Sequence, residues 1–481
     1  MEESPYDVQK DSKPKIVIAG ASGYIGRNII NELTGADIVA LSRNASKQKE
    51  SSEKVTWRSC DLFSMVEIEE CLEGADYAVY LVHSMLSSAR LTQGTFEDMD
   101  LILADNFAQA ARKKGVKQIV YLGGLIPDTE DLSRHLKSRL EVEKVLSSYS
   151  VPVTTLRAGL IVGPQGSSFP ILIKLVRRLP VMLLPKWTNT LTHPIALIDV
   201  LTGLKESIGN KDVYGKTIDI GGPEVMTYKE MMIRTAKSLD KERYLVNIPY
   251  FTPQLSRLWV SLTTNTPKNL VYPLIESLIH PMTAQRERMV EGISYGKTPF
   301  LEAAKDAIDF EEKHTKVKLS HKNNRSSSVT EDTVRSVQRL PLPAGKNAKW
   351  VALYYVKWLA KLLKPIIKVK IDENYHCQLN LIFLKEPLME FSYSKDRSTP
   401  ERALFYISGG KLADTEKNPR GRLEFRQIPE TNECLAAIHD YTPSLPWFIY
   451  VFTQAYVHLW VMNRFKKNLS QYSFPDENKM G

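Results

Sequence analysis

The sequence predicts an α/β protein whose larger part is a doubly wound parallel sheet, followed by a smaller α+β part with an antiparallel sheet and a long closing helix. Three observations support this prediction. Apolar strand-like runs alternate with helical patterns from residue 15 to 157, and a glycine-rich turn follows the first run. Beyond residue 350, strand-like runs follow one another before a final aromatic-rich segment. Alternating strands and helices are typical of parallel sheets, and consecutive strands of antiparallel ones.

Six apolar runs are expected to form the parallel sheet. Their apolar and polar residues do not alternate as in a strand with one solvent-exposed face, so we expect both faces to be buried. They are KIVIAG (15–20), DIVALS (37–42), KVTWRS (54–59), YAVYLV (77–82), QIVYLG (118–123) and PVTTLR (152–157). The longest helix between them is expected at 96–115, where cations and a final glycine mark a C-terminus.

The chain is expected to form two domains joined by a linker. The nucleotide-binding domain is expected over 13–318 and includes a substrate subdomain at about 158–318, in which Thr227 and Glu230 have the spacing of a capping box. Residues 319–349 are rich in Ser, Asn, Lys and Pro and are expected to be the linker. The second domain is expected over 350–472.

Composition narrows the class of protein. With 43% hydrophobic and 25% charged residues the chain is typical of globular proteins, and its polar N-terminus lacks an apolar secretory segment, so a cytoplasmic location is expected. The net charge of +9 comes from dispersed cations without a nucleic-acid-binding motif, so no nucleic-acid partner is expected. The four cysteines stand far apart in the sequence, so neither a zinc site nor a disulfide is expected.

The glycine-rich turn, GASGYIG at 20–26, predicts a dinucleotide-binding site. Gly20 allows the tight turn, Gly23 lets the backbone approach a pyrophosphate, and Gly26 lets the following helix pack closely on the strand. The amides at the helix start then point at the phosphates. The expected cofactor-binding residues of this turn are Gly20, Ser22, Gly23, Tyr24, Ile25 and Gly26.

The end of the second strand predicts the choice of cofactor. Ser42 and Arg43 stand where NAD-binding enzymes usually place an acidic residue on the ribose 2′-hydroxyl. A carboxylate would repel the 2′-phosphate of NADP, whereas an arginine can form charge-assisted hydrogen bonds with it. We therefore expect NADP(H) to be preferred over NAD(H); the alternative is an exposed loop arginine without such a role.

The N-terminal 300 or so residues resemble the atypical extended short-chain dehydrogenases/reductases, namely the NmrA-like NAD(P)H-binding group. The resemblance lies in GASGYIG, LSRN, SCDLFS, LRAGLIVGP with HPIALIDV, and IDIGGPEVMTYKEMM. It implies a Rossmann-like fold, contacts of Asp61 and Leu62 with the adenine ring, and a structural capping role for Asp199. The resemblance is specific for fold and cofactor and much less so for the reaction.

The sequence departs from this superfamily at the catalytic positions. Typical members use a Ser on the fifth strand and a Tyr-x-x-x-Lys pair on the next helix. Here Gly123 and Gly124 stand in place of the serine, and His135 and Arg139 have the spacing of the tyrosine and lysine. Histidine exchanges a proton near neutral pH, whereas arginine stays charged. His135 and Arg139 are therefore the candidate catalytic residues; the alternative is a solvated helix surface with ion pairs.

Val82, His83 and Ser84 follow the fourth strand, whose carboxyl end should open toward the nicotinamide, and they are expected to contact the cofactor. The alternative for His83 is a hydrogen-bonded polar residue at a strand end. Tyr121 lies inside the fifth strand and is expected to belong to the core.

The C-terminal part resembles helix-grip domains of the START or polyketide-cyclase type, which implies an apolar cavity and a hydrophobic ligand. The segment at 447–468 is aromatic and ends in Arg and Lys, and 350–365 is similar. We expect a core helix, with peripheral membrane contact through the C-terminal helix as the alternative.

Together these observations favour an NADPH-binding oxidoreductase-like protein that transfers hydride to a small or hydrophobic carbonyl, quinone or enone. His135, a bound water or the substrate would supply the proton. Two alternatives come from other classes: a non-catalytic NADP(H) sensor or assembly factor, which the missing serine and tyrosine would permit, and a carrier of a lipid or isoprenoid.

Overall fold

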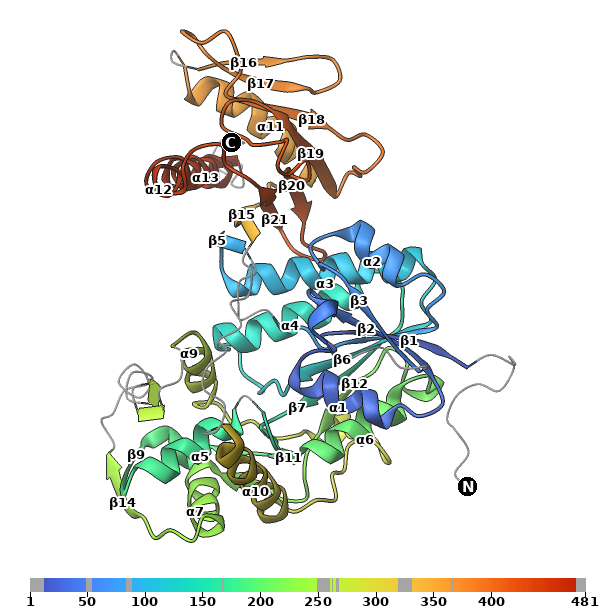
Figure 1. Cartoon of the computed structure of the whole chain (residues 1–481), viewed down its shortest axis with the longest axis vertical. Coiled ribbons are helices and arrows are strands. Elements are labelled where there is room, and N and C mark those ends of the chain that lie inside the picture. The colour runs from blue at the N-terminus through green and yellow to red at the C-terminus, as the bar shows by residue number, and fades with distance from the viewer. Residues whose placement is uncertain are drawn as a thin grey trace, which may run out of the picture. The chain divides into compact units, whose positions relative to one another are not determined.

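The computed structural model describes residues 13–48, 54–83, 89–166, 168–248, 260–261, 263–264, 268–318, 331–364 and 367–472. The chain forms two compact units (Figure 1). Unit 1 comprises Met1–Met85 and Asp100–Asn324, and unit 2 comprises Leu86–Met99 and Arg325–Gly481.

Unit 1 is built on a seven-stranded parallel sheet with the order β12-β7-β6-β4-β1-β2-β3. The order reverses at β1, as in a doubly wound fold. The strands are β1 (Lys15–Ala19), β2 (Asp37–Ser42), β3 (Val55–Ser59), β4 (Tyr77–Tyr80), β6 (Gln118–Gly124), β7 (Val153–Ala158) and β12 (Thr217–Ile220). The first six are the predicted runs. The seventh, β12, comes from the predicted substrate subdomain and extends the sheet beside β7.

Helices cover both faces of this sheet. Figure 1 shows α3 (Phe96–Lys113) and α4 (Arg134–Ser147) on one face, and α1 (Tyr24–Glu32) and α6 (Leu197–Ser207) on the other. A short helix, α2 (Met65–Cys71), follows β3. Apolar side chains of β1, α1 and α6 form a fully buried core cluster, which includes Ile16, Ile18, Ile29, Val200 and Leu204. The predicted α/β architecture of this unit is confirmed.

The rest of unit 1 has its own core, around Phe169, Ile173 and Phe300. Its helices are α5 (Phe169–Arg178), α7 (Tyr228–Ser238), α9 (Lys268–Ser277) and α10 (Phe300–Lys318). Its strands pair two by two, as β8 (Ile161–Val162) with β11 (Ile195–Ala196), β9 (Val181–Pro185) with β14 (Tyr244–Ile248), and β10 (Leu191–Thr192) with β13 (Met226–Thr227).

Two local predictions in this part have different outcomes. Thr227 caps α7, and both reciprocal bonds with Glu230 are present, so the predicted capping box is confirmed. Asp199 does not cap α6, whose N-cap residue Ala196 has no side-chain cap. The Asp199 carboxylate instead accepts a hydrogen bond of 3.0 Å from the backbone N–H of Thr298, so it ties a distant loop to the first turn of the helix.

Unit 2 contains an eight-stranded sheet with the order β16-β17-β18-β19-β20-β21-β15-β5. All neighbours are antiparallel except β15 and β5. The strands are β5 (Ala89–Gln93), β15 (Glu331–Pro341), β16 (Ile367–Ile371), β17 (Cys377–Leu381), β18 (Met389–Tyr393), β19 (Arg402–Gly409), β20 (Arg422–Gln427) and β21 (Glu433–Tyr441). Helices α11 (Ala348–Leu362) and α13 (Gln454–Tyr472) share one core cluster with the sheet, and a short helix, α12 (Trp447–Phe452), precedes α13.

Two strands of this sheet lie where the sequence predicted none. The predicted linker at 319–349 is wrong for β15, which pairs with β21 along most of its length. Strand β5 comes from a segment inside the predicted nucleotide-binding domain and pairs with β15. The polar composition of β15 predicted a linker because the partners of its charged side chains lie elsewhere in the chain. Arg335 contacts Asp440, and Arg339 contacts Asp98 and Glu433.

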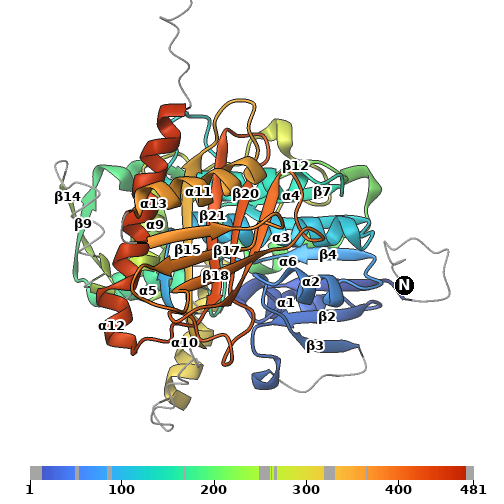
Figure 2. The same cartoon turned by 90° about the horizontal axis from the view of Figure 1, so that it is seen from above.

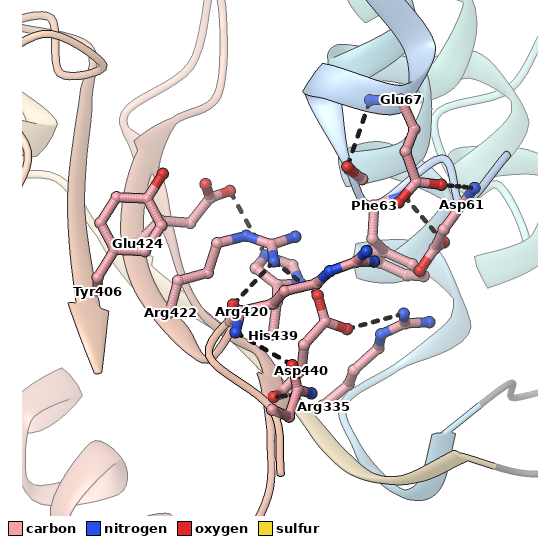
Figure 3. Close-up of polar contacts among 12 residues, drawn as sticks. Asp61, Phe63, Glu67, Arg335, Tyr406, Arg420, Arg422, Glu424, His439 and Asp440 are labelled. Atoms are coloured by element: carbon pink, nitrogen blue, oxygen red, sulfur yellow. Dashed lines mark hydrogen bonds and ion pairs between the residues drawn. The ribbon is translucent and has the colours of Figure 1, made fainter. Parts of the chain in front are cut away.

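One face of the sheet in unit 2 carries these charges. Phe425 of β20 lies in the core beneath α11, so its neighbour Glu424 points to the other face. On the charged face, Asp440 accepts from Arg335 at 3.1 Å and from Arg422 at 2.6 Å (Figure 3). Burial opposes ionisation of Asp440, but the two guanidinium groups outweigh it and lower the pKa of this carboxyl.

Two further observations concern the whole described chain. Cys60, Cys71, Cys377 and Cys434 are all buried free thiols. The fold brings Cys60 and Cys71 close enough for a hydrogen bond between their thiols, although the sequence separates them. Among the described helices, none is long and apolar enough to cross a membrane.

Candidate functional site

The glycine-rich turn joins β1 to α1 at the carboxyl edge of the parallel sheet. Gly20 has a φ of +84°, and a Cβ added there would lie 2.8 Å from the carbonyl oxygen of Leu81. A Cβ at Gly26 would lie 2.3 Å from the carbonyl oxygen of Gly20. Both contacts are with backbone atoms, which cannot move aside as a flexible side chain can. The turn therefore requires glycine at both positions.

The N-terminus of α1 is suited to an anion. Gly23 is the N-cap residue and supplies no side-chain cap, and the first turn contains no acidic residue. Ser22 and Gly23 are exposed. The backbone N–H groups of a first turn have no acceptor within the helix, and the helix dipole favours negative charge there. The residues present thus fit a pyrophosphate group.

The remaining residues of the turn support it from the protein side. Ile25 packs against the core cluster of the parallel sheet. Tyr24 lies against the loop after β8, because a Cβ at Gly163 would come within 2.5 Å of its hydroxyl oxygen. Burial raises the pKa of Tyr24, so this hydroxyl stays protonated. Contacts of Tyr24 and Ile25 with a cofactor stay predictions.

The ends of β2 and β3 lie at the same edge, since both strands run parallel to β1. Ser42 is buried and its hydroxyl accepts from the backbone N–H of Asn44 at 3.3 Å. Arg43 is exposed, and its carbonyl accepts from the Ser59 hydroxyl at 3.3 Å. Hydrogen bonds at Asn44 and at the Arg43 carbonyl therefore hold the backbone from which the Arg43 side chain extends.

The turn after β3 is held by its own hydrogen bonds. The Asp61 carboxylate accepts from the backbone N–H of Phe63 at 3.1 Å, and the Asp61 N–H donates to Glu67 at 2.8 Å (Figure 3). Leu62 is buried, and its carbonyl accepts from Asn106 at 2.9 Å. This turn presents Asp61, half-buried, at the carboxyl end of β3, where the resemblance expects the adenine contact.

His83, just beyond β4, is held by Asp100 of α3. The two side chains approach to 2.5 Å between Nδ1 and Oδ2, and they are 15% and 2% exposed. Burial and the positive charge of Arg139 lower the pKa of His83, against the opposing effect of Asp100. A neutral His83 therefore donates its Nδ1–H to the carboxylate. Val82 beside it is half-buried, and the predicted residue Ser84 lies outside the described residues.

Helix α4 brings the two candidate catalytic residues to this histidine. The rings of His135 and His83 lie 5.2 Å apart with a tilt of 58°. Burial, followed by the charge of Arg139 and the neighbouring His83, holds the pKa of His135 well below its ordinary value. Lys137 of the same helix is exposed, whereas His135 and Arg139 are half-buried. The predicted alternative, a solvated surface, thus fits Lys137 and not these two residues.

Two residues that the sequence did not single out as site residues, Asp100 and Tyr121, complete the group, and Tyr80 lies beside Tyr121. Tyr121 is fully buried, as expected of a core residue, but its hydroxyl also lies 3.4 Å from Nη1 of Arg139. The Tyr80 hydroxyl is buried without a hydrogen-bond partner among the described residues. Burial raises the pKa of both tyrosines. We call the set of His83, Asp100, Tyr121, His135 and Arg139 the histidine cluster.

The end of β6 lies next to the cluster and has room for a larger side chain. A Cβ at Gly124 would have as its nearest neighbour Cγ of Arg139, at 4.0 Å. A Cβ at Gly123 would lie 3.1 Å from the ring of Tyr121, which is a tighter contact. Crowding therefore does not explain the lack of a serine at position 124.

Comparison with known proteins agrees with this geometry. Residues 20–166 match the NAD(P)H-binding family. The chain is 31% identical over 200 residues to the auxiliary protein GraX of Staphylococcus aureus, an alignment that covers 40% of this chain and 60% of that protein. It is 22% identical over 240 residues to the NADH-ubiquinone oxidoreductase 40 kDa subunit of Neurospora crassa, with 48% and 62% covered. The alignments thus span less than two thirds of these relatives.

Among solved structures, the NADPH complex of the Escherichia coli NADPH-dependent quinone oxidoreductase QOR2 superposes with a TM-score of 0.49 at 19% identity, covering 60% of this chain and 98% of that one. The matched family segment, 20–166, contains the glycine-rich turn, Arg43, Asp61 and the whole histidine cluster. Residues 20–166 of unit 1 are therefore similar to an NAD(P)H-binding family over the segment that carries these residues.

Proposed function

We propose that unit 1 is an NADPH-dependent reductase whose substrates are quinones or enones, and that it is an atypical, NmrA-like member of the short-chain dehydrogenases/reductases. The observation that carries this proposal is the histidine cluster, which follows β4 and β6 at the same edge of the sheet as the glycine-rich turn. NADPH, when bound, supplies a hydride.

The cofactor would be held by three parts of the edge. The backbone N–H groups at the start of α1 would bind the pyrophosphate, Arg43 would bind the 2′-phosphate, and the turn of Asp61 and Leu62 would meet the adenine. Arg43 is exposed, and its sequence neighbours Ser42 and Asn44 are uncharged. This is the basis for the proposed preference for NADP(H).

The cluster is poorly suited to release a proton at neutral pH. The lowered pKa of both histidines keeps them neutral, the pKa of Tyr121 is raised, and arginine does not deprotonate. The lowered pKa argues against the predicted role of His135 as proton donor. The cluster holds one carboxylate, Asp100, which accepts from His83, and one cation, Arg139. Arg139 and the neutral ring of His135 are the groups that would stabilise a negatively charged oxygen without protonating it.

This property favours some acceptors over others. Reduction of a simple ketone or aldehyde produces a strongly basic alkoxide, which needs an acid in the same step. Reduction of a quinone or enone produces a delocalised oxyanion, which is much less basic and can take its proton from water afterwards. A site without an acid is therefore matched to the second group.

A second candidate, an NADP(H) sensor without turnover, is favoured by one observation. Gly123 and Gly124 stand where a catalytic serine would be, although position 124 has room for it. The similarity to a protein named as an auxiliary protein points the same way. For unit 2, the helix-grip resemblance and a carrier function for lipids or isoprenoids stay predictions.

The test measures NADPH oxidation by the full chain with a benzoquinone, an enone and an aldehyde. We expect turnover with the first two and little with the aldehyde. Arg139→Met should lower kcat at least tenfold, because one charge-assisted hydrogen bond is worth about 1.5–3 kcal/mol. The control Lys137→Met, on the exposed side of the same helix, should have no effect. NADPH binding without any oxidation would favour the sensor, and preferred reduction of the aldehyde would contradict the chemistry proposed for the cluster.

A further inference from the structure

Helices α12 and α13 present a stripe of exposed aromatic side chains at their outer side. Phe448 and Phe452 of α12 are 67% and 74% exposed, and Tyr456 and Trp460 of α13 are 63% and 47% exposed; in each helix the two residues are four positions apart. Single exposed apolar residues are ordinary on protein surfaces, whereas a contiguous row of large ones marks an interaction surface. We call these four residues the aromatic stripe.

The opposite side of α13 is buried in the core of unit 2. Met462, Phe465 and Leu469 are buried in the cluster that α11 and α13 share with the sheet, and the ring of Tyr355 on α11 lies 4.9 Å from that of Phe465. The sequence offered a core helix and a membrane-contacting helix as alternatives. The helix has both characters: within unit 2 it lies beside α11 and the sheet (Figure 2), while its residues Tyr456 and Trp460 are exposed.

Charge is distributed unevenly around the stripe. No Asp or Glu occurs from residue 447 to 472, or in α11, whereas α11 has three lysines and α13 contributes Arg464, Lys466 and Lys467. The guanidinium of Arg464 lies 5.3 Å from the ring centre of Trp460, so a cation is fixed at the end of the aromatic stripe. An anionic partner would meet no repelling carboxylate of these helices.

A hollow of about 500 Å³ adjoins the cationic end of the stripe. Its lining consists of Trp358 and Leu362 from α11 and Arg464, Lys467, Asn468 and Gln471 from α13. It thus combines an apolar wall with two cations and two amides. This is the set of groups that would receive a phosphate headgroup together with the first part of its apolar chain.

We propose that α12 and α13 dock unit 2 on the surface of a membrane that carries anionic phospholipid. The aromatic stripe enters the interfacial layer, the cations of α13 attract the lipid phosphates, and the hollow takes one headgroup. Aromatic side chains with basic residues on one helix face are typical of helices that lie in the plane of a membrane interface. The proposal is independent of the function proposed for unit 1.

Vesicle flotation of the full chain tests the proposal, with vesicles of phosphatidylcholine alone and of phosphatidylcholine with phosphatidylserine. We expect binding to the second kind only, and weaker binding as salt is added. Arg464→Glu with Lys467→Glu should lower partitioning at least 25-fold, at about fivefold for each cation lost. Phe452→Ser with Tyr456→Ser and Trp460→Ser should abolish it. Tyr244→Ser, which removes an exposed tyrosine of unit 1, is the matched control and should have no effect.

Each variant is checked for folding by its circular dichroism spectrum and thermal unfolding. Light scattering of the free chain measures its oligomeric state and so tests the alternative that a second copy of this chain binds the aromatic stripe. A dimer that the serine variant turns into a monomer would overturn the proposal, as would equal binding to neutral vesicles, no binding to anionic vesicles, or unchanged binding of the folded variants.

Discussion

The buried ion pair of Glu143 and Arg157 anchors the helix that carries His135 and Arg139. Arg157, on β7, donates from Nε at 2.9 Å and from Nη2 at 3.0 Å to the two carboxylate oxygens of Glu143, on α4. The hydroxyl of Thr217 donates to the same carboxylate at 2.7 Å. The two charged side chains are only 7% and 11% exposed. Loss of one partner would leave the other charge buried and unpaired.

We expect Arg157→Met to lower the free energy of unfolding by about 3–5 kcal/mol, the cost typical of breaking a buried pair from one side. Urea denaturation followed by near-ultraviolet circular dichroism measures this change. The matched control is Glu143→Leu with Arg157→Met, which removes both charges and should recover most of the loss. A loss below about 1 kcal/mol in the single variant, or no recovery in the double variant, would refute the reasoning.

Three further predictions concern the turn, the cluster and pH. Gly26→Ala brings a Cβ to 2.3 Å from a backbone oxygen, so we expect about 1–3 kcal/mol of destabilisation and weaker NADPH binding by calorimetry; unchanged binding would contradict the role of the turn. Gly124→Ser should fold with less than about 1 kcal/mol of change in urea, since its nearest neighbour lies 4.0 Å away. Burial lowers the pKa of His458 to about 4, whereas the unfolded chain takes up this proton near pH 6.5. The free energy of unfolding should therefore be highest above pH 6.5 and fall by about 3 kcal/mol as pH drops to 4. His458→Gln should remove this part of the pH dependence of urea unfolding.

The sequence predicted those parts of the fold that depend on local pattern. Five of the six strands were predictable because they are short runs buried on both faces, and the glycine-rich turn because its steric needs lie within seven residues. The expectation of two buried faces was wrong for β3 (VTWRS), an edge strand in which half-buried and exposed residues alternate. Strands β5 and β15 depend on partners far away in the chain. The polar residues of β15, such as Arg335, read as a linker until Asp440 is placed opposite them.

The candidate site divides in the same way. His135 and Arg139 were predictable because their spacing on one helix is a local property. Asp100 is 17 residues from His83, and only the packing of α3 against the sheet brings it into contact. No sequence signal singled out Asp100, because it follows Glu97 and Asp98 in the acidic first part of the predicted helix.

The exchange of Tyr and Lys for His135 and Arg139 changes what a nearby cation does. A cation beside tyrosine favours the ionised form and so moves its high pKa toward neutrality, where the group becomes an effective acid. The same cation beside histidine disfavours the ionised form and moves a pKa that is already near neutrality farther below it. Arg139 acts in this second sense on both His135 and His83. His135 and Arg139 therefore keep the spacing of the Tyr-x-x-x-Lys pair but supply no group that releases a proton at neutral pH, which is why the proposed acceptors are those whose reduced oxygen tolerates a negative charge.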